Sequence, residues 1–177
     1  RRTGETTAIK GGKRSDGNGA IMRLAAVPCM HWQNVEKARS IAIAQSQCTH
    51  HSPLSEGCCD LMALILCRLI SGDNWEQILP YPSELNWLEE VSLLSNCNWR
   101  NKAEEEVQST GYVIHTLEAA IWCVDTTNSF QDAVLKAVNL GEDADTVGAV
   151  TGQIAGARYG IESIPDVWLS ELVDQPR

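Results

Sequence analysis

Four glycines near the end of the chain constrain its fold more than any other feature. Gly148, Gly152, Gly156 and Gly160 recur at every fourth residue. This spacing places them on one face of an α-helix, where each glycine costs about 1 kcal/mol relative to alanine. A bare face offsets that cost when a neighbouring helix or a ligand comes close to the backbone. We therefore expect a helix that is packed tightly along the glycine stripe and held still at its first turn.

The rest of the chain also follows helical patterns. Apolar side chains with a period of about 3.6 residues predict helices over residues 34–47, 53–71, 111–126 and 129–141. Ser83 is a plausible N-cap for a short helix beginning at Glu84, and residues 96–109 are polar and are expected to be exposed. No alternating strand pattern of any length occurs. The sequence predicts an all-α fold of six to eight helices, forming one domain over residues 1–177.

Charge and composition exclude several classes of partner. The net charge of −9 disfavours nucleic acid and anionic membranes, and the apolar run at 61–67 is shorter than a membrane span. The seven cysteines are odd in number and include no CxxC pair. These features predict a reduced, cytoplasmic protein that binds neither nucleic acid nor membrane.

An acidic cluster directly precedes the glycine stripe. Glu142, Asp143 and Asp145 are followed by the hydroxyl of Thr146. In an extended loop, residues i and i+2 point the same way, so the two aspartates would aim at one point and suit Mg²⁺ or Ca²⁺. Helix capping is the alternative, because an N-cap aspartate stabilises a helix by about 1 kcal/mol. The residues alone leave both interpretations open.

Two other features favour a ligand site only weakly. The loop "SDGNG" at 15–19 has small residues that can turn N–H groups toward an anion, although such a loop is often a simple turn. His50 precedes a predicted helix and would lie at a pocket rim, but a lone histidine is more often a surface residue.

Together these segments resemble the ADP-ribosylglycohydrolase family. The resemblance rests on "SDGNGAIMR" (15–23), "CTHHSPLS" (48–55), "GYVIHTLEAAIW" (111–122), "NLGEDADTVGAVTGQIAGARYG" (139–160) and "SIPDVWLSEL" (163–172), in this order. It implies an all-helical hydrolase that removes ADP-ribose from modified arginine or serine side chains, or that cleaves related ADP-ribosyl compounds. It also implies two Mg²⁺ ions, or Mn²⁺ in some members, that bind the ribose and a water molecule.

The same resemblance assigns site residues. The implied metal ligands are Asp143, Asp145 and Thr146. Tyr112 is expected to stack near the adenine. The implied substrate-binding residues are Ser15, Asp16, Gly17, Asn18, Gly19, His50, Gly111 and Tyr112.

One family motif has no counterpart in this sequence. Members carry an N-terminal Thr-Asp-Asp metal motif and an acidic catalytic residue, so the resemblance is to the C-terminal portion and leaves the catalytic residue unknown. The chain is then expected to bind metal weakly by itself and to require an N-terminal segment as a partner. A non-catalytic ADP-ribose-binding module and a plain helical scaffold are the alternatives.

Overall fold

The apolar run at 61–67 lies in the central helix of the fold. The computed structural model describes residues 7, 16–82, 84 and 86–172, and in it α4 spans Pro53–Ile70 and is buried along most of its length. Ser52 caps this helix by accepting a hydrogen bond from the N–H of Ser55, and Pro53 occupies the first turn, where its missing N–H costs nothing. Helices α1, α2, α3, α5, α6, α7 and α9 all contact α4.

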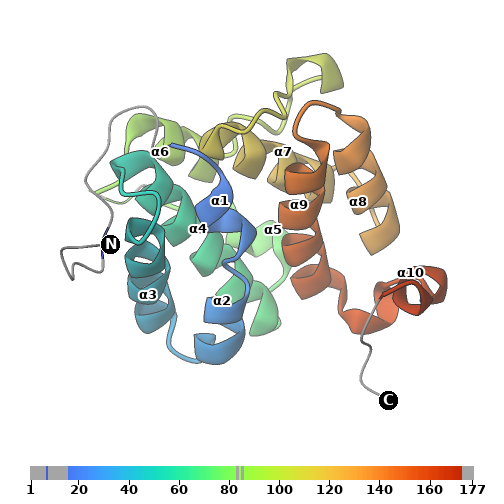
Figure 1. Cartoon of the computed structure of the whole chain (residues 1–177), viewed down its shortest axis with the longest axis horizontal. Coiled ribbons are helices and arrows are strands. Elements are labelled where there is room, and N and C mark those ends of the chain that lie inside the picture. The colour runs from blue at the N-terminus through green and yellow to red at the C-terminus, as the bar shows by residue number, and fades with distance from the viewer. Residues whose placement is uncertain (1–6, 8–15, 83, 85, 173–177) are drawn as a thin grey trace, which may run out of the picture.

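The described residues form ten α-helices around one apolar core. Figure 1 shows α3 on one side of α4 and the pair α8 and α9 on the other. The helices are α1 (Gly19–Met22), α2 (Ala26–His31), α3 (Val35–Gln47), α4, α5 (Trp75–Ile78), α6 (Glu89–Ser95), α7 (Val113–Asp125), α8 (Phe130–Asn139), α9 (Ala144–Tyr159) and α10 (Asp166–Ser170), with 3₁₀ turns at Glu104–Glu106 and Ile161–Ser163.

The predicted all-α class and the long helices are confirmed, and the predicted number of helices is wrong. Within the described residues no strand forms, and the five long helices lie where their periodicity placed them. Ser129 caps α8 by accepting from the N–H of Asp132, and Gly141 follows α8 with a φ of +80°. The structure exceeds six to eight helices because short helices such as α1 and α5 span too few residues to show a periodicity.

Two local predictions are wrong. Glu84 lies outside any helix, and the helix of this region begins at Glu89 instead. The segment 96–109 is not uniformly exposed, because Trp99 is fully buried and its indole N–H donates to the carbonyl of Leu94. Val107 and Ser109 are buried as well, so this polar segment contacts the core at several positions.

The glycine stripe packs tightly at one position only. A Cβ atom on Gly148 would lie 2.8 Å from Val138 on α8, whereas one on Gly152 would meet no described atom within 4 Å. At Gly156 the nearest contact would be 3.9 Å, and Gly160 ends the helix with a φ of +81°. Helix α9 is instead buried along a face that includes Val147, Val150 and Ile154. The expectation of close packing along the whole stripe is therefore wrong.

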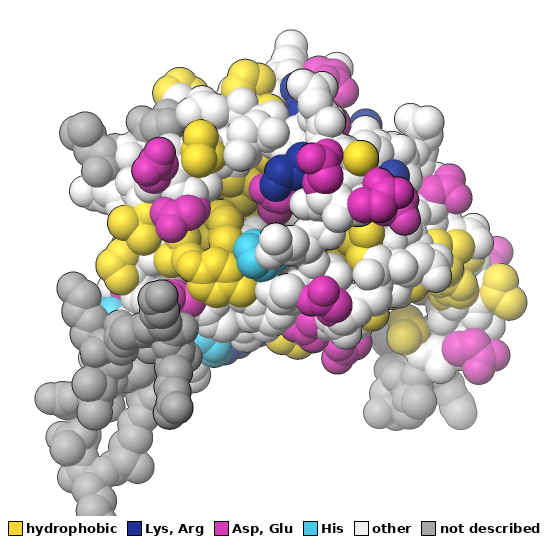
Figure 2. Space-filling model, turned by 90° about the horizontal axis from the view of Figure 1, so that it is seen from above, with side chains coloured by type: hydrophobic (Ala, Val, Ile, Leu, Met, Phe, Trp, Pro, Cys, Tyr) yellow, Lys and Arg dark blue, Asp and Glu magenta, His cyan; other side chains and the backbone are white. Residues whose placement is uncertain are grey.

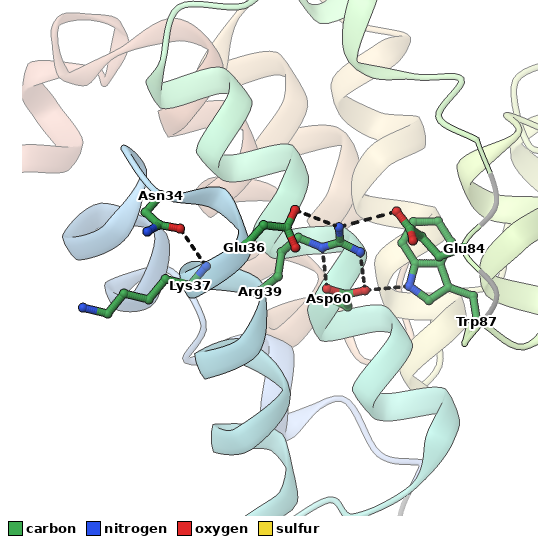
Figure 3. A network of polar contacts seen from close by, with 7 residues as sticks. All are labelled: Asn34, Glu36, Lys37, Arg39, Asp60, Glu84 and Trp87. Carbon is green, nitrogen blue, oxygen red and sulfur yellow. Dashed lines mark hydrogen bonds and ion pairs between the residues drawn. The ribbon is translucent and has the colours of Figure 1, made fainter.

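A buried ion pair holds α3 against α4 (Figure 3). Arg39 on α3 donates from Nε to Asp60 Oδ1 at 2.7 Å and from Nη2 to Oδ2 at 2.8 Å. The Trp87 indole also donates to Asp60 Oδ2, at 2.7 Å, and Glu84 lies 3.5 Å from the guanidinium. These bonds satisfy the carboxylate, raise the pKa of Arg39, and connect the segment before α6 to α3 and α4.

All seven cysteines lie among the described residues and are free thiols. Among the described helices none is long and apolar enough to cross a membrane.

Candidate functional site

The loop before α1 pairs with the segment before α7. Gly17 and Tyr112 form an isolated antiparallel bridge, although almost a hundred residues separate them in the sequence. Two of the residues assigned to the substrate are therefore neighbours in space. The bridge is flanked by hydrogen bonds from the Asn18 N–H to the Gly111 carbonyl (3.2 Å) and from the Val113 N–H to the Asp16 carbonyl (2.9 Å).

Asn18 connects this pairing to the acidic cluster. Its amide Nδ2 donates to Asp143 Oδ2 at 2.6 Å and to Thr116 Oγ1 at 2.9 Å, and the side chain is 9% exposed. Thr146 donates from Oγ1 to the other oxygen of Asp143, at 2.9 Å. The glycine-rich loop and the acidic loop thus meet through one carboxylate whose two oxygens both accept side-chain donors.

The capping alternative does not describe Asp143. This residue occupies the N-cap of α9, but its side chain makes no hydrogen bond to a backbone N–H of the helix. The expected extended loop is also wrong, because α9 begins at Ala144 and Asp145 lies in its first turn. Asp145 is exposed and makes no hydrogen bond or ion pair with any residue that the structure describes. Its charge is placed favourably at the positive end of the helix.

The imidazole of His50 lies against the glycine-rich loop. A Cβ atom on Gly19 would lie 2.8 Å from His50 Cε1, and one on Gly17 would lie 3.3 Å from Nε2. A side chain at position 19 would displace the ring, so glycine is required there to make room for the histidine. The glycines therefore do more than allow unusual backbone angles.

Thr49 and Arg23 form a chain of hydrogen bonds that holds this ring. Arg23 Nη2 donates to Thr49 Oγ1 at 2.7 Å, and Thr49 Oγ1 lies 2.8 Å from His50 Nδ1. Arg23 occupies one lone pair of this hydroxyl oxygen, and the Thr49 hydroxyl proton can donate to Nδ1. In the tautomer that accepts this proton, the neutral ring carries its own proton on Nε2, beside the glycines. Burial, with a contribution from Arg23, lowers the pKa of His50 and favours this neutral form.

Tyr112 presents an aromatic ring at the edge of the pairing. It is 37% exposed and contacts the His115 ring edge to face, with the centroids 5.0 Å apart. His115 Nδ1 lies 2.9 Å from Thr110 Oγ1. Partial burial, together with the nearby charges of Asp16 and Glu90, raises the pKa of the Tyr112 hydroxyl. The phenol is therefore neutral at physiological pH and offers an apolar face.

The structure brings most of the predicted site residues together. Asp16, Gly17, Asn18, Gly19, His50, Gly111, Tyr112, Asp143 and Thr146 are linked by the contacts above, and Asp145 lies in the first turn of α9. Ser15 lies outside the described residues.

The oxygen donors fit a hard cation only in part. Asp143, Asp145 and Thr146 offer carboxylate and hydroxyl oxygens, the ligand type that Mg²⁺ takes, and each oxygen of Asp143 keeps a lone pair beyond its hydrogen bond. Mg²⁺ requires about six oxygens. Among the described residues no three His, Cys, Asp or Glu side chains form a group that could hold a metal ion.

Sequence reasoning missed the residue that joins α9 to α1. Gln153 accepts from the Ala25 N–H at 2.9 Å and donates to the carbonyls of Ile21 (3.2 Å) and Met22 (2.9 Å). These groups lie where the short helix α1 ends and lacks helical partners. Thr116 and Arg23 were missed for the same reason: their partners are remote in sequence, and no spacing signals them.

Comparison with known proteins gives one consistent result. The family model described as ADP-ribosylglycohydrolase matches residues 1–177. The chain is 41% identical over 166 residues to ADP-ribosylarginine hydrolase Tri1 of Serratia proteamaculans, covering 91% of this chain and 44% of that protein. It is 30% identical over 168 residues to the ADP-ribosyl-(dinitrogen reductase) glycohydrolase of Rhodospirillum rubrum, covering 94% and 54%.

A solved structure has the same fold. The chain superposes on an ADP-ribosylglycohydrolase-related protein complex with a TM-score of 0.82 and 32% identity, covering 92% of this chain and 57% of the other. The chain spans about half the length of the curated relatives it matches.

Proposed function

Because the chain belongs to the ADP-ribosylglycohydrolase family, we propose that it provides the ADP-ribose-binding half of a hydrolase that releases ADP-ribose from modified protein side chains. The observation that carries the proposal is the hydrogen bond between Asn18 and Asp143, which joins the glycine-rich loop to the acidic cluster at 2.6 Å. Arginine is the side chain we favour, since a relative at 41% identity is an ADP-ribosylarginine hydrolase.

Different residues of the site would bind different parts of the ligand. The neutral His50 ring, with its proton on Nε2 beside the glycine-rich loop, would donate to a phosphate or ribose oxygen. Tyr112 offers an exposed aromatic face on which an adenine can stack. Asn18 keeps the Asp143 carboxylate in one orientation at the N-terminus of α9.

Magnesium is the cofactor we propose, with Asp143, Asp145 and Thr146 as part of its ligand set. When bound, such ions hold the ribose oxygens and lower the pKa of a water molecule. The residues named above would hold the ligand in one orientation while the bond from the ribose carbon to the guanidinium nitrogen breaks. We assign no general acid among the described residues.

The test combines binding with release. Calorimetry would measure ADP-ribose affinity with and without Mg²⁺, and chromatography would follow release of ADP-ribose from an ADP-ribosylated arginine peptide. We expect Asp143→Asn to weaken Mg²⁺-dependent binding at least about 10-fold. Asp166→Asn, an exposed aspartate at the start of α10, is the matched control and should change nothing.

Different outcomes separate the alternatives. Metal-dependent binding without release would favour a non-catalytic ADP-ribose-binding module. If a folded chain does not bind ADP-ribose at all, the proposal is contradicted. The plain helical scaffold would then be the interpretation that remains.

A further inference from the structure

A cavity of about 190 Å³ lies between α6, the segment after it and α7. It is separate from the contacts that join Asn18, His50 and Asp143. Its lining includes Glu90, Leu93, Lys102, Glu106, His115 and Glu118.

One side chain, His115, connects this cavity to the candidate site. His115 lines it, and the same ring contacts Tyr112 edge to face at 5.0 Å. Glu90 lines it too, and its charge is close enough to Tyr112 to contribute to the raised pKa of the phenol. Tyr112 therefore stands between the glycine-rich loop and the cavity.

The cavity carries negative charge. It has three carboxylates and one ammonium, and Lys102 is paired with Glu118. Glu106 accepts from the Ala103 N–H at 2.8 Å, whereas Glu90 makes no hydrogen bond or ion pair with the described residues. Burial lowers the pKa of His115, so that this ring adds no positive charge at neutral pH. A pyrophosphate would be repelled here, and a guanidinium would be attracted.

The surface beside the cavity is apolar. Leu93, which lines the cavity, is 44% exposed, and Tyr112, which contacts the cavity residue His115, is 37% exposed. Figure 2, which looks onto the molecule from the side of α6 and α7, shows hydrophobic side chains gathered beside a histidine and flanked by acidic side chains. Exposed apolar side chains next to the unpaired carboxylate of Glu90 match a segment that has both apolar and basic residues.

We propose that this cavity, with the exposed Leu93 side chain, binds the polypeptide that carries the ADP-ribosylated side chain, and that it selects segments with basic and apolar residues around the modified arginine. The inference rests on the function proposed above. It adds a place for the protein part of the substrate, on the far side of Tyr112 from the glycine-rich loop.

The experiment compares three ligands by calorimetry at low salt. They are ADP-ribose, an arginine-ADP-ribosylated peptide with basic and apolar flanks, and the same peptide with acidic flanks. We expect the basic peptide to bind more tightly than ADP-ribose and the acidic peptide to bind more weakly than the basic one. Glu90→Gln should weaken the basic peptide by about threefold, the size of one partly screened charge pair, and leave ADP-ribose unchanged.

Two further variants complete the design. Leu93→Ser should also weaken only the peptides, whereas Glu89→Gln, an exposed neighbour on α6 that does not line the cavity, should change neither ligand. Equal affinities for the two peptides, with ADP-ribose still bound, would overturn this inference and leave the proposed function intact. Loss of ADP-ribose binding in the unaltered chain would contradict the proposed function itself. A dimer that Leu93→Ser dissolves would assign the surface to a second copy instead and would also overturn the inference.

Discussion

Replacing Asn18 by aspartate tests whether the link between the two loops governs the site. The substitution keeps the shape of the side chain but sets a carboxylate 2.6 Å from an oxygen of Asp143. Two unit charges at that distance repel by about 6 kcal/mol at an effective dielectric constant of about 20. Protonating a carboxyl group with a pKa near 3.9 at pH 7 costs about 4 kcal/mol, which is less. The folded variant should therefore take up a proton rather than tolerate both charges.

The sign of the pH dependence follows from that proton. The introduced carboxylate has a higher pKa in the folded state than in the unfolded state, so the unfolded chain binds fewer protons above pH 4. Asn18→Asp should thus cost little free energy of unfolding near pH 4 and lose about 1.4 kcal/mol per pH unit above it, up to about 4 kcal/mol at pH 7. Asn18→Leu removes the hydrogen bonds to Asp143 and Thr116 without adding charge. The free energy of unfolding that it costs should therefore not depend on pH in this way.

Urea unfolding followed by circular dichroism at pH 5 and pH 7.5 measures these differences. Asn128→Asp, at an exposed position in the turn before α8, is the matched control for the added charge. If Asn18→Asp destabilises the protein equally at both pH values, or no more than Asn128→Asp, then Asn18 does not hold Asp143 as described. Millimolar Mg²⁺ should recover part of the loss at pH 7.5, because a cation between two carboxylates offsets their repulsion.

Three other substitutions have defined outcomes. Asp60→Ala leaves the buried Arg39 guanidinium without its bidentate partner, so urea unfolding should show a loss of about 3 to 5 kcal/mol in the free energy of unfolding. A loss below about 1 kcal/mol would contradict a stabilising role for this ion pair. Thr151→Val should raise the melting temperature, because the buried Thr151 hydroxyl has no hydrogen-bond partner in the described part of the chain; a lower melting temperature would reveal a partner. Nitrogen-detected NMR should show His50 neutral and protonated on Nε2 down to below pH 6.5. Thr49→Val should populate both tautomers, and an unchanged spectrum would show that Thr49 does not select the tautomer.

The long helices were predictable because their signals are local. The span of α8 follows from a cap at Ser129, a 3.6-residue period and a glycine with positive φ at Gly141, all within a few residues of one another. In contrast, the burial of Trp99 depends on space that other helices leave, and the ion pair of Arg39 with Asp60 depends on how α3 packs on α4. Neither is encoded in any short window of sequence.

The candidate site divides in the same way. Residue types and motifs singled out both loops, but the bond from Asn18 to Asp143 joins positions 125 residues apart, and only packing brings them together. The glycine stripe shows the opposite error: spacing placed Gly148, Gly152 and Gly156 on one helical face correctly, yet could not tell that only the first of them meets a neighbour at close range.

The bridge between Gly17 and Tyr112 has a consequence for the kinetics of folding. Its closure, and that of the neighbouring bond from Asn18 to Thr116 across 98 residues, must wait until the intervening helices have found each other, since long chain segments are costly to close early. Few backbone bonds secure this junction, so amide protons around it should exchange with solvent sooner than those of α4. A ligand that binds there would then slow the opening of this junction.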